Sequence, residues 1–208
     1  DYVQKLWRED KPFDWQGNFY KGKGVYSLPH PAQSSVPVLN AAASEEGRAF
    51  AMRNADFLFT PVFDFDQASE TVDDINIRAK AVGRNVNVLT FSTVVCRSTQ
   101  AEAEEYLDYY ANQHADWEAV DNLMTLQGLH AQSFTKEALA AFRDRFAAGH
   151  GGFPLVGTPD HIADQLEKMS ATGVAGTTLA FVDYAREFPY FRQEVLPRLE
   201  ARGLRAPV

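Results

Sequence analysis

The sequence predicts an α/β fold in which parallel strands alternate with helices. Several short apolar runs each lead into a segment with helical periodicity, which is the order of β-α units. The runs are apolar at almost every position, as expected for parallel strands that are buried on both faces. With 208 residues, 45% of them hydrophobic, the chain is long enough for one sizeable core. Four such units fit either a small open sheet or half of an eightfold barrel, and periodicity alone does not decide.

The first 37 residues are expected to hold one helix and then irregular chain. Apolar residues recur at helical spacing from the start, at Tyr2, Val3, Leu6 and Trp7. No N-terminal cap precedes them and the chain begins with Asp1 rather than Met, so we expect further sequence upstream. Residues 11–37 are expected to be irregular because prolines at 29, 31 and 37 break regular structure.

Four strands are predicted after this segment. They are residues 36–39, 56–59, 86–95 and 177–182, the third being rich in β-branched residues. The first leads into a helix that begins after Ser44, and the second into a helix that ends at Gly83. After the third, Thr99 and Glu102 have the spacing of a capping box.

The second half of the chain is predicted to be mainly helical. A long helical stretch spans residues 101–146, and a glycine-rich loop follows at 147–153. Thr158 as N-cap and Pro159 at the first position start another helix, which Gly173 ends. A closing helix runs to Gly203.

Composition excludes several classes of protein. A net charge of −8 without a basic stripe argues against a nucleic-acid partner. Cys96 is the single cysteine, so the chain has no internal disulfide. No apolar run reaches the roughly 20 residues of a membrane helix, and no signal peptide is visible, so we expect a cytoplasmic protein without a membrane partner.

Metal and nucleophile signatures are weak. The five histidines are scattered without metal-ligand spacing, and the pair Asp64 and Asp66 lacks the glycine and distal glutamate of a calcium loop, so we expect no metal. No Gly-x-Ser-x-Gly elbow is present. Cys96 ends an apolar strand, where a lone cysteine is typically a small core residue.

The turn from Val38 to Ser44 is the clearest candidate for phosphate binding. A strand ends there in small residues, which let a ligand approach the backbone, and a helix begins. Ser44 offers a hydroxyl beside the free amides of the helix start. Ser44 as a plain helix cap remains the alternative. Glu45 and Glu46 stabilise a helix start, yet would repel a phosphate if they faced it.

Two further features lie where barrel enzymes place their chemistry, or close to it. Asp183 and Tyr184 follow the last strand, and carboxyl ends of strands carry the active sites of barrels. Asp183 is a candidate for substrate contact, with helix capping as the alternative. The loop that contains His150 is either a lid over a site or a plain connection.

At this point five stretches, in order along the chain, resemble the bacterial-luciferase-like flavin-dependent monooxygenases. They are Phe13-Asp-Trp-Gln-Gly-Asn-Phe-Tyr20, Asn40-Ala-Ala-Ala-Ser44-Glu-Glu-Gly47, Ala55-Asp-Phe-Leu-Phe-Thr60, Leu155-Val-Gly-Thr-Pro159 and Phe191-x-x-x-Val-Leu-Pro197. Within this family, the sequence most resembles the two-component enzymes that act on sulfones, alkanesulfonates and pyrimidine rings. The resemblance covers nearly the whole chain.

The resemblance implies a (βα)₈ TIM barrel of which this chain, residues 1–208, supplies strands five to eight as the C-terminal half. It implies binding of reduced FMN, with Ser44 on the phosphate and Ala42, Ala43 and Gly47 lining the same turn. It also implies that a separate flavin reductase supplies the cofactor, that a flavin peroxide transfers one oxygen atom from O2 to a small substrate, and that the full-length protein is a homodimer.

The resemblance places substrate contacts on the strand at 86–95, at Phe91 and Thr93, with Asp183 and His150 as further candidates. Sulfonate-using relatives carry Arg and His at the first two positions, so a neutral or aromatic substrate is expected here. Two alternatives remain: a deazaflavin-dependent oxidoreductase of the same superfamily, and a flavin-binding protein without turnover.

Overall fold

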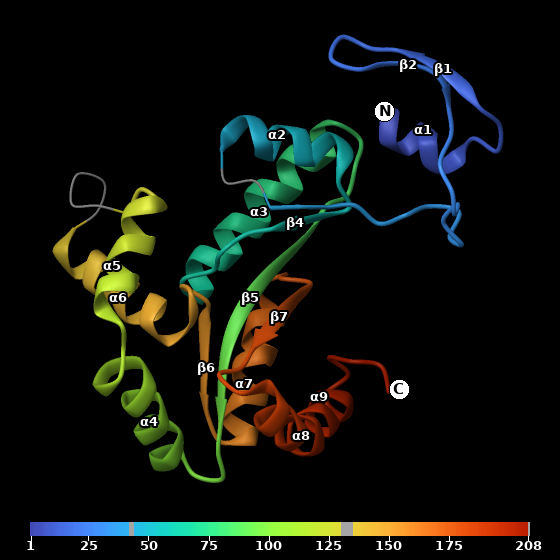
Figure 1. Ribbon diagram of the computed structural model, residues 1–208. Helices are drawn as coiled ribbons and strands as arrows, with labels where there is room; N and C mark the ends of the chain where they lie inside the picture. Colours follow the sequence, from blue (N-terminus) through green and yellow to red (C-terminus); the bar gives the residue numbers. More distant parts are fainter. Residues whose placement is uncertain (42–43, 130–134, 208) are drawn as a thin grey trace. The chain divides into compact units, whose positions relative to one another are not determined.

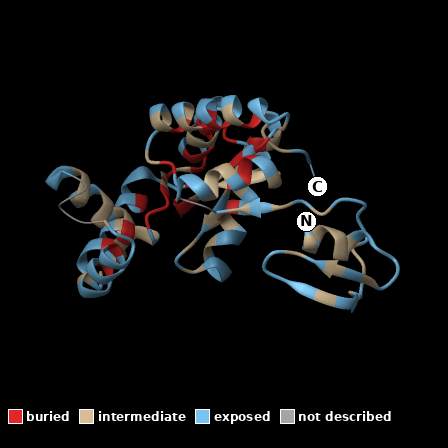
Figure 2. Ribbon diagram, turned by 90° about the horizontal axis from the view of Figure 1, so that it is seen from above, coloured by how far each residue is buried: buried red, intermediate tan, exposed pale blue. Residues whose placement is uncertain are grey.

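The computed structural model describes residues 1–41, 44–129 and 135–207, and the chain divides into two compact units. The first unit is Asp1–Val38 and the second is Leu39–Val208 (Figure 1). Figure 2 shows buried positions in the second unit, whereas all 38 residues of the first are exposed or half-buried. The core of the described chain therefore belongs to the second unit.

The first unit contains helix α1 (Tyr2–Arg8) and an antiparallel hairpin of β1 (Phe13–Gln16) and β2 (Lys21–Val25). The predicted helix is confirmed. The expectation that 11–37 is irregular is wrong for the hairpin, whose Lys- and Gly-rich second strand lacks a strand pattern. Ring contacts that no local pattern predicts support it: the Tyr2 ring lies 5.3 Å from Trp15 and 6.2 Å from Tyr20.

The second unit is built on a five-stranded sheet in which every observed pair is parallel. Its strands are β3 (Leu39–Asn40), β4 (Phe57–Phe59), β5 (Asn87–Cys96), β6 (Phe153–Gly157) and β7 (Gly176–Ala180). β5 is the longest strand and pairs with three of the others. It pairs with β4 at residues 87–89 and with β6 at 92–96, while β7 pairs at 89–93. The predicted parallel α/β fold is thereby confirmed.

Four of these strands correspond to predicted ones, but β6 was not predicted. The segment Phe153–Gly157 directly follows the glycines of the loop predicted at 147–153 and contains Pro154, so its sequence does not indicate a strand. The strand instead forms because its five residues pair in register with the carboxyl half of β5. The first predicted strand, 36–39, overlaps the observed β3 (Leu39–Asn40) at Leu39 alone.

The helices follow the predicted order with one large correction. They are α2 (Glu45–Asn54), α3 (Phe65–Ala81), α4 (Gln100–Asp108), the π-helix η1 (Tyr109–Gln113), α5 (Trp117–Leu126), α6 (Lys136–Gly149), α7 (Pro159–Ala171), α8 (Tyr184–Glu194) and α9 (Leu196–Ala201). The long helical stretch predicted over 101–146 is divided into α4, η1, α5 and α6, because Asp116 and Thr135 are the N-caps of new helices and the chain turns at Gly128, where φ is +74°. The predicted caps at Ser44, Thr99 with Glu102, and Thr158 are confirmed.

The two faces of the sheet differ in burial. Leu58, Val88, Thr90 and Ser92 share one face and are at most 2% exposed. The intervening residues Phe57, Phe59, Leu89 and Phe91 are only half-buried. Helices α3 and α7, which pack against each other, carry buried apolar residues, so we assign the buried face to them. The second face is incompletely covered.

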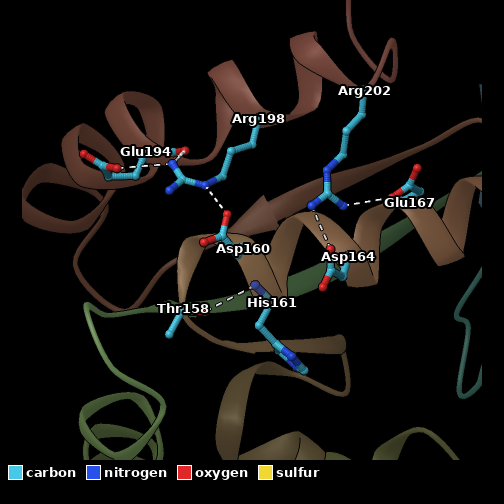
Figure 3. A network of polar contacts seen from close by, with 8 residues as sticks. All are labelled: Thr158, Asp160, His161, Asp164, Glu167, Glu194, Arg198 and Arg202. Carbon is cyan, nitrogen blue, oxygen red and sulfur yellow. Dashed lines mark hydrogen bonds and ion pairs between the residues drawn. The ribbon is translucent and has the colours of Figure 1, made fainter.

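Ion pairs join α9 and the residue that follows it, Arg202, to α7 (Figure 3). Arg198 Nε lies 2.6 Å from Asp160 Oδ1, and Arg202 lies 2.7 Å from Asp164 and 2.8 Å from Glu167. These pairs are exposed and hold the closing helices rather than any site. Among the described residues, no helix has both the length and the apolarity required to cross a membrane.

Candidate functional site

The turn after β3 ends in the start of α2. Ser44 is exposed, and its Oγ accepts a hydrogen bond from the amide of half-buried Gly47 at 3.2 Å. Ala42 and Ala43, the other predicted members of this turn, lie outside the described residues. The first N–H groups of a helix have no acceptor within the helix, so this exposed start offers donors for an anion beside a hydroxyl.

The charges around this turn favour an anion more than the sequence indicated. Glu45 forms an ion pair with Arg78 of α3, which also lies 3.3 Å from Asp74. The hydrogen bond to Glu45 raises the pKa of Arg78 above its ordinary value. Arg48, in the first turn of α2, has a buried Nε without a partner among the described residues. Glu45 therefore shares the Arg78 cation with Asp74, and the Arg48 guanidinium, one turn into the helix, has one buried nitrogen without an acceptor.

The half-buried face of the sheet carries an aromatic pair. The ring of Phe59, at the end of β4, stacks on Phe91 of β5 with a centroid distance of 5.9 Å and an interplanar angle of 22°. Phe91 pairs in register with Thr178 of β7, which is exposed. Phe91 is thus part of an apolar, partly accessible wall, and Phe59 is a member of that wall that sequence reasoning missed.

The glycine loop, residues 149–152, lies directly on the predicted substrate positions of β5. Thr93 Oγ1 donates to the carbonyl of Gly149 at 3.2 Å, and a Cβ on Gly152 would lie 3.0 Å from the Phe91 ring. His150 has a left-handed backbone, with φ 55°, and its Nε2 lies 3.2 Å from the amide nitrogen of Gln127. The structure therefore brings Phe91, Thr93 and the His150 loop together.

Asp183 follows β7 and acts as the N-cap of α8. Its carboxylate accepts from the amide of Arg186 at 3.2 Å and lies 3.4 Å from the guanidinium of the same residue. This geometry supports helix capping, the alternative to substrate contact for Asp183. Ser44 and Asp183 each follow a strand of their own and belong to separate clusters.

An ion pair that the sequence did not reveal links the carboxyl ends of β5 and β7. Arg97 Nη2 lies 2.7 Å from Glu187 Oε1, and the other carboxylate oxygen accepts from the amide of Asp183 at 3.0 Å. The guanidinium also stacks on Tyr106 at 4.0 Å. No local signal could have found this pair, because its members are 90 positions apart.

The pocket around Arg97 has a volume of about 770 Å³ and opens between α4 and α8. Cys96 lies at its wall, and burial raises the pKa of the thiol to about 11. A thiol with this pKa stays protonated near neutral pH, which fits the core role expected of it. Within the described ranges, no group of three or more His, Cys, Asp and Glu side chains is placed to hold a metal ion.

Comparison with known proteins relates this chain to one family. A family model described as luciferase-like monooxygenase matches residues 1–176. The FMNH(2)-dependent dimethylsulfone monooxygenase of Pseudomonas fluorescens (strain Pf0-1) is 30% identical over 97% of this chain and 57% of its own length. The dimethyl-sulfide monooxygenase of Hyphomicrobium sulfonivorans is 27% identical, over 92% of this chain and 46% of its own length.

The structural comparison agrees. The crystal structure of DmoA from Hyphomicrobium sulfonivorans has a TM-score of 0.81 and 23% identity, over 97% of this chain and 54% of that one. The chain thus spans about half the length of the relatives it matches. Because the family model covers most of the residues, the resemblance seen in the sequence is confirmed, and the chain belongs to the luciferase-like monooxygenase family.

Proposed function

We propose that this chain is the C-terminal half of a (βα)₈ TIM barrel that works as an FMN-dependent monooxygenase. The reaction inserts one oxygen atom from O2 into a small organic substrate. Support comes from the family, and from a 30% identical relative that is named as FMNH(2)-dependent. Deazaflavin dependence remains the alternative chemistry, and flavin binding without turnover the alternative without catalysis.

The strand order supports the half-barrel. β3, β4, β5 and β7 are joined in this order by parallel pairs, as four consecutive strands of a barrel would be, while the short β6 between β5 and β7 in the chain pairs in addition with the carboxyl half of β5. The half-buried face with Phe59 and Phe91 corresponds to a barrel interior whose remaining wall is supplied by other strands. We therefore assign strands five to eight of the barrel to β3, β4, β5 and β7.

The observation that carries the cofactor assignment is the Ser44 turn. An exposed hydroxyl and the first amides of a ten-residue helix follow the carboxyl end of a parallel strand, where barrels bind phosphate. The Arg48 guanidinium with its orphaned Nε adds a cation. These residues fit the phosphate of FMN, and Gly47 keeps the turn small; Ala42 and Ala43 complete it in the sequence.

Reduced FMN, when bound, supplies the activation of O2. The chain's own residues bind and orient. The Ser44 turn holds the phosphate, while the aromatic pair Phe59 and Phe91 offers a dry wall to the substrate. Because this wall is uncharged, a neutral or aromatic substrate fits it better than a sulfonate. His150, on the adjoining loop, is a titratable candidate for substrate contact.

The partners follow from the same proposal. A monooxygenase that uses free reduced FMN needs a separate flavin reductase, and we also expect a homodimer of the full-length protein. A light-scattering mass equal to one full-length chain would contradict the dimer.

The test is an anaerobic titration with chemically reduced FMN, and in parallel with a reduced deazaflavin cofactor. The proposal predicts saturable binding of FMN and weaker binding of the deazaflavin; the reverse preference would favour the alternative chemistry.

We expect the 208-residue chain alone to be inactive, so turnover is tested in the full-length protein by admitting isotopically labelled O2 with dimethyl sulfide, dimethyl sulfone or small aromatic compounds. Labelled product detected by mass spectrometry is the expected result. Tight FMN binding with no labelled product from any compound would favour the non-catalytic alternative.

A further inference from the structure

The glycine loop is held at its start by two hydroxyl groups from different elements. Thr93 of β5 donates to the carbonyl of Gly149 at 3.2 Å, and Tyr110 of η1 donates to the neighbouring carbonyl of Ala148 at 2.9 Å. The two donors are thus attached to consecutive carbonyls. Both carbonyls belong to the last turn of α6, where the helix itself supplies no donors, so the two hydroxyls fix the point at which the loop leaves the helix.

The loop backbone also packs against the sheet without side chains in between. A Cβ on Gly152 would lie 2.8 Å from Thr93 Oγ1 and 3.0 Å from Phe91, and a Cβ on Gly149 would collide with Thr93. Glycine is required at both positions for this close approach. The amides of His150, Gly151 and Gly152 are bonded to Phe146, Arg145 and Gly149 respectively, so the loop has a defined closed form.

Both hydroxyl groups are shielded from water and stay protonated near neutral pH, so both can donate a hydrogen bond there. Thr93 is 5% exposed. Burial raises the pKa of Tyr110 to about 12, so its phenol keeps its proton throughout the physiological range. Tyr110 belongs to a π-helical turn, a rare element that is often found at functional sites.

We propose that Thr93 and Tyr110 are positioning residues that together pin the glycine loop over Phe91. Thr93 then acts through the loop rather than by touching the substrate, which revises the role expected from the sequence. Pinning sets how far the loop closes over the aromatic wall and how well water is excluded there. The importance of this for turnover rests on the proposed function, whereas the pinning itself does not.

The test is hydrogen–deuterium exchange of the loop amides in the 208-residue chain. Thr93→Val removes the donor but keeps the shape, and Tyr110→Phe removes only the phenolic oxygen. Each should speed exchange at His150, Gly151 and Gly152 by about 2- to 10-fold, the effect of one hydrogen bond. Thr93→Ser, which retains a hydroxyl, should restore slow exchange.

Matched controls are available on the same elements. Thr90 lies on β5 with a buried Oγ1 that has no hydrogen-bond partner among the described residues, so Thr90→Val removes a hydroxyl without breaking a bond. Tyr109→Phe is the equivalent change on η1, at a half-exposed ring. Neither control should change exchange in the loop, and none of the variants should change exchange in β7.

Unchanged loop exchange in both Thr93→Val and Tyr110→Phe would overturn the proposal. So would equal acceleration in the two controls, because it would indicate general loosening. A second arm adds reduced FMN to the full-length protein, in which slower exchange of the loop amides is expected. If Thr93→Val and Tyr110→Phe behave as expected but FMN has no effect on any amide of the full-length protein, the proposed function fails while the pinning holds.

Discussion

At the scale of single residues, Arg97 makes three kinds of contact at the carboxyl end of β5: an ion pair, a hydrogen bond and a cation–π contact. It pairs with Glu187, donates to the Cys96 carbonyl at 2.8 Å and stacks on Tyr106. Glu187 has a side chain only 10% exposed, so its charge depends on this one guanidinium. Arg198 of α9 also forms ion pairs, but its partner Asp160 is 72% exposed.

Replacing Arg97 should therefore cost far more than replacing Arg198. Arg97→Met leaves a nearly buried carboxylate without its cation, and we expect the free energy of unfolding to fall by about 3 kcal/mol. Arg198→Met breaks one exposed pair with Asp160 and one partly exposed pair with Glu194, both of which water screens, and a loss below about 1 kcal/mol is expected. Urea denaturation of both variants measures the difference; equal losses would contradict this account of Arg97.

Residue roles could be predicted from the sequence where they are local. The caps at Ser44, Thr99 and Thr158 bond to amides three positions along the chain, so spacing alone identifies them. The hydrogen bond of Thr93 could not be predicted, since its acceptor Gly149 is 56 positions away. Ser44 was identified as a candidate phosphate ligand by its place at a strand end, yet the ion pair of Glu45 required the position of α3.

At the scale of elements, the start of α4 depends on a carboxylate. Glu102 accepts from the amide of Thr99 at 3.0 Å and from Ser98, and these hydrogen bonds lower its pKa. A lowered folded-state pKa means that the contribution to stability is present above the ordinary value near 4.5 and is lost as pH falls through the lowered one.

The variant Glu102→Gln should reveal this dependence. We expect it to be less stable than the unmodified chain at about pH 7, and the gap to narrow toward about pH 3 as protonation of the carboxylate increases. Urea denaturation at both values measures the gap. Glu105→Gln, which removes a charge from α4 outside the capping box, is the control. A gap that widens on acidification would refute the assignment.

Elements were predictable where their own residues fix them. β5 is β-branched at half of its ten positions, and α7 has both a cap and a proline at its start. β6 and the β1-β2 hairpin depend on pairing partners, which no periodicity records. The stretch 101–146 was read as continuous because its helical spacing continues across the caps that divide it.

At the scale of the whole second unit, one sheet face is incompletely covered and the strands β3 and β7 each have one edge without a described partner. Apolar faces and free edges promote association. We expect the 208-residue chain to show a concentration-dependent mass by light scattering. Thr178→Lys, opposite Phe91 on the open face, should shift it toward the mass of one chain.

Ala185→Lys adds the same charge at an exposed position of α8 and serves as the control. It should leave association unchanged. The mass of a single chain at every concentration would contradict the expectation of an open face. The sequence pattern could predict parallel β-α units at this scale, but not whether four units close on themselves, because closure depends on strand tilt and register rather than on composition.

The central claim, that the Ser44 turn holds the phosphate of reduced FMN, is tested most directly by Ser44→Asp. Aspartate caps a helix as well as serine does, so α2 is kept while a negative charge is added. Thr135→Asp makes the same kind of change at the cap of α6 and is the matched control.

Anaerobic titrations with reduced FMN and with reduced riboflavin, which lacks the phosphate, complete the measurement. The account predicts that Ser44→Asp weakens FMN binding at least about 10-fold, the equivalent of 1.4 kcal/mol, and leaves riboflavin binding unchanged. Thr135→Asp should change neither. Equal weakening of both flavins, or no weakening of FMN, would contradict the placement of the phosphate at this turn.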